Sequence, residues 1–283
     1  MPDPQLAENT AGAAAERAPQ IRAAPQEIAP LVALTWNVQW LGDTEHGPED
    51  EARQLALAVD SLTFADADLI GLQEVSSAAS AQALAQAFPG YTLERSRYPQ
   101  PQNVALMYRA DRLELRELSA VRGLDDAGRA PLEARFALPS GRELFVIVLH
   151  AKAGDDPRSY QIRKRFSEGL AAYLAGKHLG NDVVLLGDFN DLFSSSTLES
   201  ATSPYQSLLE SQAFVAPTAE LEAQSERSTV WGATVDHIVV SRSLGSAVVP
   251  GSVETLRDEL LARHPDFFEA ASDHAPVTLE LRL

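Results

Sequence analysis

Short apolar runs rich in β-branched residues recur along the chain, and each is bounded by polar residues. Their length and composition predict buried β-strands. They lie at Leu31–Trp36, Leu69–Leu72, Val104–Tyr108, Leu144–Leu149, Val183–Leu186 and Val277–Leu281. Amphipathic stretches separate many of them, at Glu49–Phe64, Ser76–Phe88, Tyr160–Leu179 and Glu254–Arg263. Strands interspersed with helices predict a layered α/β fold.

The ends of these strands carry side chains that can perform chemistry. They are Asn37, Glu74, His150, Asp188 with Asn190, Asp236 at the start of its strand, and Asp273 with His274. Asn and Asp are common after strands because they favour turns, and one alone needs no other explanation. A series that also contains Glu and His is hard to explain by turns, and it predicts a shared active site.

The segment Gly187-Asp188-Phe189-Asn190-Asp191 is the most informative of these ends. It delivers a carboxylate and an amide to the rim of a sheet. Asp188 is suited to orient and deprotonate an attacking water. Asn190 is suited to donate to a phosphate oxygen, whereas Asp191 has no catalytic role that we can assign and is expected to cap the next turn. The pair favours phosphoester hydrolysis.

The ordered set of motifs resembles the endonuclease/exonuclease/phosphatase superfamily of metal-dependent phosphoesterases. The matching segments are Trp36-Asn37-Val38, Leu72-Gln73-Glu74-Val75, Leu149-His150-Ala151-Lys152, Gly187–Asp191, Val235-Asp236-His237-Ile238 and Ser272–Pro276. The resemblance covers residues 31–283 and implies one catalytic domain of α/β (α+β) class, a four-layered sandwich of two mixed β-sheets flanked by helices, as in DNase I. Gly128–Leu132 and the His-x-Lys strand end are most similar to the bacterial exported-nuclease branch.

A metal site is expected around Glu74, since Mg²⁺ prefers carboxylates, water and phosphate oxygens. We expect Mg²⁺ or Mn²⁺ there, with Asn37 beside Glu74 and Asp273 as a further carboxylate on the metal side. The alternatives are a solvated Glu at a helix start and an ordinary turn Asn.

The resemblance also implies that Asp236 pairs with His274, which fixes the tautomer of the imidazole and raises its pKa. His150 would donate to the other face of the phosphate. In some nucleases of the superfamily a Glu holds the matching His; here Gln102 and Asn103 occupy that region. His237 follows Asp236 within a strand, so alternation predicts a structural role. The remaining histidines, His46, His178 and His264, are expected on the surface.

Cationic residues follow several of the motif strands. We expect Arg129, Lys152 and Arg163 to contact substrate phosphates, because Arg and Lys donate well to phosphate. For the neighbouring Lys164 and Arg165, a solvated helix face is the better interpretation.

Composition adds limits to this picture. The 283 residues carry a formal net charge of −17 and no Cys, which excludes thiolate chemistry and disulfides. Nucleic-acid binders are usually basic, so the charge favours a phospholipid or small phosphoester substrate unless the cleft is locally positive. Residues 1–30 are rich in Ala, Pro, Glu and Gln and predict a disordered tail. That tail lacks the pattern of a signal peptide, and no run is long enough to span a membrane.

The sequence therefore predicts a monomeric, Mg²⁺- or Mn²⁺-dependent phosphodiesterase with nucleic acid as its substrate and no stable protein partner. The alternatives are a sphingomyelinase-like phospholipid hydrolase, an inositol-phosphate or other small phosphoester hydrolase, and a non-catalytic binding module. The presence of every motif position disfavours the last. The compartment stays open, and the resemblance favours export, to the periplasm or medium, over a cytoplasmic place.

Overall fold

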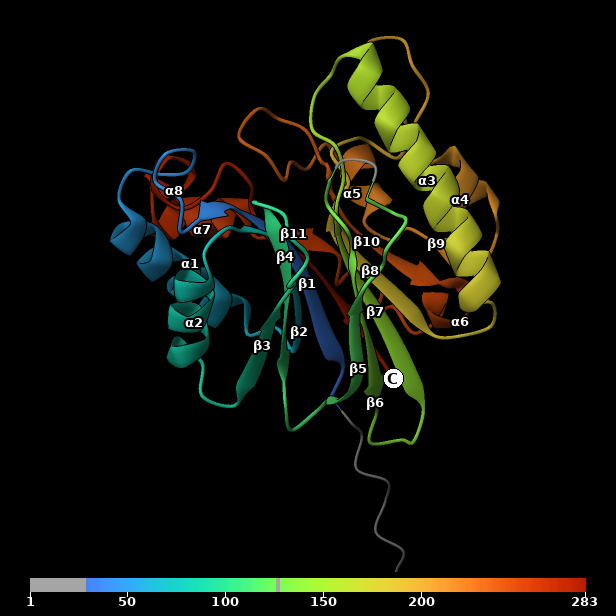
Figure 1. Ribbon diagram of the computed structural model, residues 1–283, viewed down its shortest axis with the longest axis horizontal. Helices are drawn as coiled ribbons and strands as arrows, with labels where there is room; N and C mark the ends of the chain where they lie inside the picture. The colour runs from blue at the N-terminus through green and yellow to red at the C-terminus, as the bar shows by residue number, and fades with distance from the viewer. Residues whose placement is uncertain (1–28, 126–127) are drawn as a thin grey trace, which may run out of the picture.

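The computed structural model describes residues 29–125 and 128–283. Two six-stranded sheets pack face to face, and helices cover their outer faces, which gives four layers (Figure 1). This confirms the predicted architecture. The predicted tail, residues 1–30, lies outside the described residues except for Ala29 and Pro30, whose carbonyl oxygens accept hydrogen bonds from Arg112.

The first sheet contains the motif strands β1 and β2. Its strand order is β11 (Glu254–Thr255), β12 (Val277–Leu281), β1 (Leu31–Leu41), β2 (Leu69–Val75), β4 (Asn103–Arg109) and β3 (Tyr91–Arg95). Only β1 and β2 run parallel; the other neighbours are antiparallel.

The second sheet contains the motif strands β7, β8 and β10. Its strand order is β5 (Glu114–Ala120), β6 (Leu132–Ala137), β7 (Glu143–His150), β8 (Val183–Asp188), β10 (Asp236–Ser241) and β9 (Phe214–Val215). Here β7 and β8 are the parallel pair. Both sheets are thus mixed.

Helices pack on the outer face of each sheet. Those on the first sheet are α1 (Glu51–Ala65), α2 (Ala78–Ala87), α7 (Arg257–Arg263) and α8 (Phe267–Ala270). The second sheet carries α3 (Pro157–Lys177) and α4 (Gln206–Glu210), with the short α5 (Ala219–Ala223) and α6 (Arg242–Gly245) beside it. The helix expected at Glu254–Arg263 begins only at Arg257, because Glu254 and Thr255 pair with β12. None of the described helices is long and apolar enough to cross a membrane.

The long helices begin where the sequence supplies caps. The side chain of Asp156 accepts hydrogen bonds from the backbone N–H groups of Arg158 and Ser159, and Pro157 occupies the first turn of α3. Ser77 caps α2 and Asp50 caps α1 in the same way. Such side chains satisfy N–H groups that have no partner within the helix.

The strand directions bring the motif residues to one edge of the sandwich. Parallel pairing places the ends of β1 and β2 together, and likewise those of β7 and β8. β10 runs antiparallel to β8, so its first residue, Asp236, lies opposite Asp188. The sheets approach closely nearby: a Cβ atom on Gly71 would lie 2.6 Å from the Cβ of Leu186. Only glycine permits this approach.

Candidate active site

The polar strand ends converge at one end of the sandwich, between the two sheets. The residues that hydrogen bonds or close ion pairs join there are Asn37, Glu74, Arg129, His150, Asp188, Asp236 and His274. Asp273 directly precedes His274, and Asn190 lies beside Asp188. The sequence thus identified residues that the fold does bring together.

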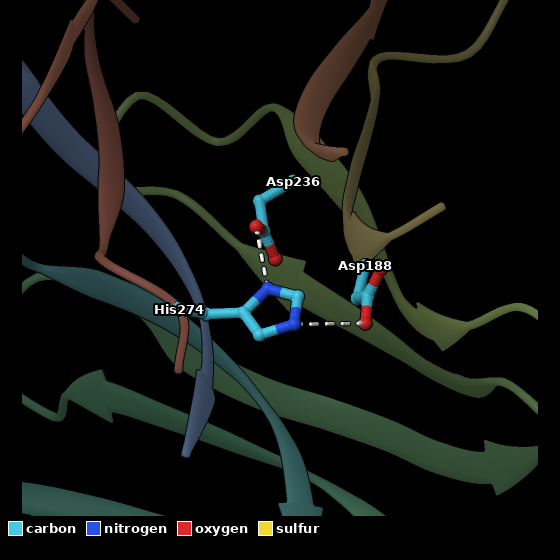
Figure 2. A group of neighbouring side chains, drawn as sticks. All are labelled: Asp188, Asp236 and His274. Carbon is cyan, nitrogen blue, oxygen red and sulfur yellow. Dashed lines mark hydrogen bonds and ion pairs between the residues drawn. The ribbon is translucent and has the colours of Figure 1, made fainter. Parts of the chain in front are cut away.

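Asp188, Asp236 and His274 form a compact group, shown in Figure 2. His274 Nδ1 lies 2.8 Å from Asp236 Oδ2, and its Nε2 lies 4.0 Å from Asp188 Oδ2. Ser228 Oγ donates to Asp236 Oδ2 at 2.6 Å. Because Asp236 accepts the Nδ1 proton, the other ring nitrogen of His274 faces Asp188.

The charges of this group follow from its burial and its composition. Burial alone would lower the pKa of His274, but Asp236 and Asp188 raise it to about 10. Burial also raises the pKa of Asp188, an effect that the His274 cation opposes. His274 is therefore cationic at neutral pH, and Asp188 binds a proton more readily than an exposed carboxylate does.

Asn37 joins the two sheets across the site. Its Nδ2 donates to Glu74 Oε1 at 3.2 Å and to Asp188 Oδ2 at 3.0 Å. Its Oδ1 accepts from the backbone N–H of Gln39 at 2.9 Å. In this arrangement the amide holds two carboxylates in place, and a metal on Glu74 would meet an amide oxygen of Asn37 only after the amide turned over.

Glu74 occupies a strained and desolvated position. Its φ of 63° lies in the left-handed region, which costs a non-glycine residue about 1 kcal/mol or more. Its Oε2 accepts from the backbone N–H of Trp40 at 3.0 Å. Burial raises its pKa, and the nearby Asp273 adds to that rise. Such strain at a polar group is characteristic of functional positions.

The acidic residues fit a divalent cation by their chemistry. Burial raises the pKa of Asp273, as it does that of Glu74. Desolvated carboxylates near one another repel, and a hard cation relieves that repulsion. Asp188, Asp236 and His274 offer a second grouping, with ligand atoms within 4.8 Å of one another. Because the charge of Asp273 raises the pKa of Glu74, a cation bound between these two carboxylates would relieve their repulsion.

His150 is held by Arg129 rather than by an amide. Arg129 Nη1 lies 2.9 Å from His150 Nε2 and donates to Ala151 O at 2.8 Å. Gln102, one of the two amides in the region where some nucleases carry a Glu, accepts a hydrogen bond from Arg129. Burial, followed by the charge of Arg129, lowers the pKa of His150 well below its usual value. A neutral His150 accepts from Arg129, so the arginine is the stronger phosphate donor of the two.

Asn190 and Lys152 border the same end of the sheet. Asn190 donates one amide N–H to Ala151 O at 3.2 Å, and the amide has a second N–H. Its φ of 53° is one that Asn adopts more readily than most residues. Lys152 donates to Ala153 O, and burial, together with the charge of Arg129, lowers its pKa.

Arg163 does not lie where a substrate phosphate could contact it. Its side chain is fully buried and pairs with Asp191 at 2.7 Å. Its Nη1 donates to the carbonyl oxygens of Lys152 and Gly154. The expectation of a phosphate contact is wrong, because every face of this guanidinium meets protein. Asp191 also accepts a hydrogen bond from the backbone N–H of Thr197, which holds the turn that follows Asp191. Through its pairing with Arg163, Asp191 also holds the loop that carries Lys152.

The remaining histidines divide into structural and surface residues. His237 is buried, stacks on Phe193 and contacts Thr218 Oγ1 through Nδ1, as its predicted structural role requires. His178 was expected on the surface but is only 2% exposed and bonds Glu133. Its partner lies 45 residues away in the sequence, which no local pattern indicates.

Trp231 is a site residue that the motifs did not reveal. Its ring packs edge-on against His274, with centroids 5.1 Å apart, yet the residue is 56% exposed. Its loop is bound to the motif, because the N–H of Val230 donates to Asp273 O. A Trp beside Gly232 in a polar segment just before Asp236 was the available signal.

Solved structures share this fold. They include the human Nocturnin catalytic domain with bound sulfate (19% identity, TM-score 0.64, 89% of this chain and 93% of that one). D. rerio TDP2 complexed with single-strand DNA product matches at 16% identity and a TM-score of 0.66, covering 89% and 98%. A mannosyl-6-phosphatase from Bacteroides thetaiotaomicron matches at 18% and 0.61, covering 89% and 99%. Among curated proteins, nothing matches the sequence.

Solved structures at such low identity show the fold and not the family. A family model identifies the family. Residues 34–274 match the model described as the Endonuclease/Exonuclease/phosphatase family. The match begins just before Asn37 and ends at His274, so it spans the whole set of polar strand ends. The chain belongs to the endonuclease/exonuclease/phosphatase family.

Proposed function

We propose that this protein is a divalent-metal-dependent phosphodiesterase that hydrolyses nucleic acid. The observation that carries the proposal is the contrast between a buried cluster of carboxylates and imidazoles and the unpaired cations around it. The cluster supplies a base and a cationic imidazole, and the cations supply a local attraction for a polyanion.

Each residue has a role that its contacts support. Asp188, whose pKa burial raises, takes the proton of the attacking water. A bond forms between the water oxygen and phosphorus, the bond to the leaving oxygen breaks, and that oxygen takes a proton from solvent. His274 remains cationic beside the phosphate, and the free amide N–H of Asn190 donates to a non-bridging oxygen. Preorganised charge of this kind is usually the largest catalytic contribution.

Glu74 and Asp273 would hold the divalent cation, because burial raises the pKa of both carboxyl groups and the charge of Asp273 raises that of Glu74 further. When bound, Mg²⁺ or Mn²⁺ supplies positive charge that stabilises the developing charge on the phosphate oxygens. Asn37 keeps Glu74 and Asp188 at a fixed separation from one another.

The distribution of cations favours nucleic acid despite the net charge of −17. Elsewhere in the described residues most arginines and lysines pair with carboxylates: Arg53, Arg109, Arg112, Arg116, Arg135, Arg142, Arg163, Lys177, Arg257 and Arg263. At the catalytic end, Arg129, Lys152 and Arg158 form no such ion pair within the described segments. Free cations next to a buried reactive cluster suit an extended polyanion.

Trp231 supports the same substrate class. An exposed indole beside His274 has a face on which a nucleobase can stack, and such stacking is tolerant of sequence. The similarity to TDP2 complexed with single-strand DNA product is consistent with this proposal.

Hydrolysis of a phospholipid or a small phosphoester is the second candidate. The acidity of the chain favours it, since a substrate with one phosphate needs no basic surface. The similarity to a mannosyl-6-phosphatase is consistent with it as well. The two candidates differ in whether an oligonucleotide is a substrate.

A side-by-side turnover screen tests the proposal. Plasmid DNA, RNA, an oligonucleotide, sphingomyelin, inositol phosphates and a sugar phosphate would each be incubated with Mg²⁺, Mn²⁺ or EDTA. Asp188→Asn is the matched control, since it keeps the shape of the base and removes its charge. We expect metal-dependent cleavage of DNA or RNA that this variant loses. Turnover of only sphingomyelin, an inositol phosphate or the sugar phosphate would reject the nucleic-acid assignment.

Glu74→Gln tests the metal assignment separately. The change keeps the side-chain shape but removes the charge that a hard cation requires. We expect the apparent affinity for Mg²⁺, measured by titration of activity and by calorimetry, to fall together with turnover. Near-normal activity at limiting Mg²⁺ would show that Glu74 does not hold the cation.

A further inference from the structure

A groove of about 640 Å³ lies between the two sheets at the edge formed by β3 and β5. Its walls are the end of β3 with the turn after it, Glu94–Pro99, and the end of β5 with Arg122; Leu132 also lines it. A volume of this size is ordinary for a ligand cleft. None of its lining residues belongs to the catalytic cluster.

The groove exists because both walls are edge strands. β3 is the last strand of the first sheet and β5 is the first of the second, so neither has a neighbour on its outer side. The two sheets are therefore not joined along this edge, and the core between them opens towards solvent. Figure 1 shows β3 in the first sheet and β5 in the second.

The charge of the groove is positive in an acidic protein. Arg97 and Arg122 are exposed, and neither forms an ion pair with any carboxylate that the structure describes. Arg95 donates to the carbonyl oxygens of Val75 and Ser76, which leaves its charge uncompensated. Glu94 is the one carboxylate among the lining residues.

The tyrosine of the groove is fixed in place. Tyr98 lines the wall between the arginines, and its hydroxyl donates to a carboxylate oxygen of Asp125. Holding the hydroxyl limits the freedom of the ring, and an ordered aromatic ring offers a stacking surface at low entropic cost. Asp125 is thereby engaged with Tyr98.

The groove adjoins the catalytic cluster through two bonded loops. Gln100 Oε1 accepts from the backbone N–H of Ala130 at 2.8 Å, and Gln102 accepts from Arg129. Arg129 in turn contacts His150 in the cluster. The loop that follows the groove residue Pro99 and the segment that precedes Leu132 therefore meet at Arg129, between the groove and the reactive groups.

We propose that this groove binds the sugar-phosphate backbone of a polynucleotide next to the scissile phosphate, with Arg97 and Arg122 contacting successive phosphates. The inference rests on the proposed function. It names the part of the polynucleotide, the backbone next to the scissile phosphate, that would determine how long a good substrate must be. A strand crossing Arg129 from the cluster enters the groove and meets cations rather than the acidic surface. A substrate with a single phosphate gains nothing from it.

Binding and turnover are tested with Arg97→Gln, Arg122→Gln and the double variant. Arg116→Gln is the matched control, because Arg116 is also exposed on β5 but pairs with Glu114 and does not line the groove. Affinity for fluorescent single-stranded oligonucleotides of increasing length is measured by anisotropy in EDTA, across a salt series. Turnover of the same oligonucleotides is compared with that of bis(p-nitrophenyl) phosphate, which has one phosphodiester and no extended backbone.

We expect affinity and kcat/KM of the wild type to rise with length and then level off. The double variant should lose on the order of tenfold for the longer oligonucleotides and nothing for bis(p-nitrophenyl) phosphate. Its slope of log affinity against log salt should flatten by about 1.4, since each phosphate contact on a single strand contributes about 0.7.

The proposal and the assigned function fail in different ways. Oligonucleotide binding that is equal in the double variant and in Arg116→Gln overturns the groove, even if DNA or RNA is cleaved. Equal losses on bis(p-nitrophenyl) phosphate also overturn it, since the arginines would then act on the reacting phosphate or on folding. Length-dependent binding that the double variant loses, without cleavage of any oligonucleotide, supports the groove and rejects the nuclease assignment.

Discussion

Two buried carboxylate–histidine pairs in this protein have nearly the same geometry and opposite surroundings. In the candidate site, His274 Nδ1 lies 2.8 Å from Asp236; on the outer face of the second sheet, His178 Nε2 lies 2.9 Å from Glu133. The two histidines are 3% and 2% exposed. Distance and burial therefore do not distinguish the catalytic candidate from the structural pair.

In the His178–Glu133 pair under α3, several donors surround one carboxylate. Glu133 accepts hydrogen bonds from His178, Lys177 and Tyr173. Burial alone would raise the pKa of Glu133, but these donors lower it to about 2. The second nitrogen of His178, Nδ1, meets no partner among the described residues. One carboxylate with several donors is a stable attachment of the C-terminal end of α3 to β6.

In the His274–Asp236 pair of the candidate site, two carboxylates face one cationic imidazole. His274 faces both Asp236 and Asp188, and the negative charge exceeds the positive. Asp236 Oδ1 has no hydrogen-bond partner in the described part of the chain. A buried polar group without a partner is costly, and at a functional site it is often completed by a ligand or a water. Each pair has one polar atom that is unpartnered within the described segments, so the excess of negative charge around His274, rather than pairing or a missing partner, distinguishes the pair in the site.

Asp236→Asn should have the largest effect and should act on rate alone. The amide cannot hold His274 as a cation, so we expect kcat on the best substrate to fall by about 10²-fold or more, the scale of losing one preorganised group that stabilises the developing charge. Replacing both residues should cost little more than the worse single change, since they act as a unit. Thermal unfolding should change little. Additive losses in the double variant would mean that the two side chains do not cooperate.

Glu133→Gln should show the reverse behaviour. The change removes a charge that several donors share, and hydrogen bonds to charged groups are worth about 1.5–3 kcal/mol. We expect the free energy of unfolding in urea to fall by about 2 kcal/mol, with kcat unchanged. Glu117→Gln is the control, because Glu117 pairs with Arg135 at an exposed position and should contribute under about 1 kcal/mol. A loss of rate in Glu133→Gln without a loss of stability would show that Glu133 supports catalysis and not the attachment of α3.

The difference in stability between wild type and Glu133→Gln should depend on pH. The pKa of Glu133 is lower in the folded protein, about 2, than its ordinary value of 4.5. Its contribution is therefore complete above pH 4.5 and is lost as the pH falls towards 2. We expect the difference in unfolding free energy between wild type and Glu133→Gln to shrink by about 1 kcal/mol between pH 5 and pH 3. A difference that grows over this range would contradict the assigned sign.

Local patterns were sufficient for the strands that carry the motifs and for most of the site, but they did not indicate the edge strands β3, β5, β9 and β11. Apolar runs that end in Asn37, Glu74, His150 and Asp188 are readable because each run and its polar end are contiguous in the chain. Parallel pairing then brings those ends together, which follows from the layered fold. The boundaries were less accurate: β1 continues past Asn37 to Leu41 through a turn of positive φ at Gln39 and Trp40.

Features that depend on distant partners could not be predicted. In the sequence, Arg163 resembles a phosphate ligand because it lies in a basic segment. In the structure it pairs with Asp191, which only the packing of α3 on the second sheet brings beside it. His178 is buried for the same kind of reason. Trp231 lies outside every motif, and its importance rests on an edge contact to His274 across the fold.

The smallest effect should come from the aromatic neighbours of the two histidines. His178 lies against Phe145 and Tyr173, with ring centroids 4.6 Å and 5.7 Å away, inside the protein. Trp231 contacts His274 by one edge and leaves much of its ring in solvent. If that ring stacks on a base, Trp231→Ala should raise KM for an oligonucleotide by about fivefold, near the lower end of measured base stacking. KM for bis(p-nitrophenyl) phosphate and the unfolding temperature should not change.

Trp231→Phe should recover most of the affinity, since a phenyl ring can also stack. An equal loss of kcat on both substrates would instead show that Trp231 supports the position of His274, and the exposed ring would then belong with the structural aromatics around His178.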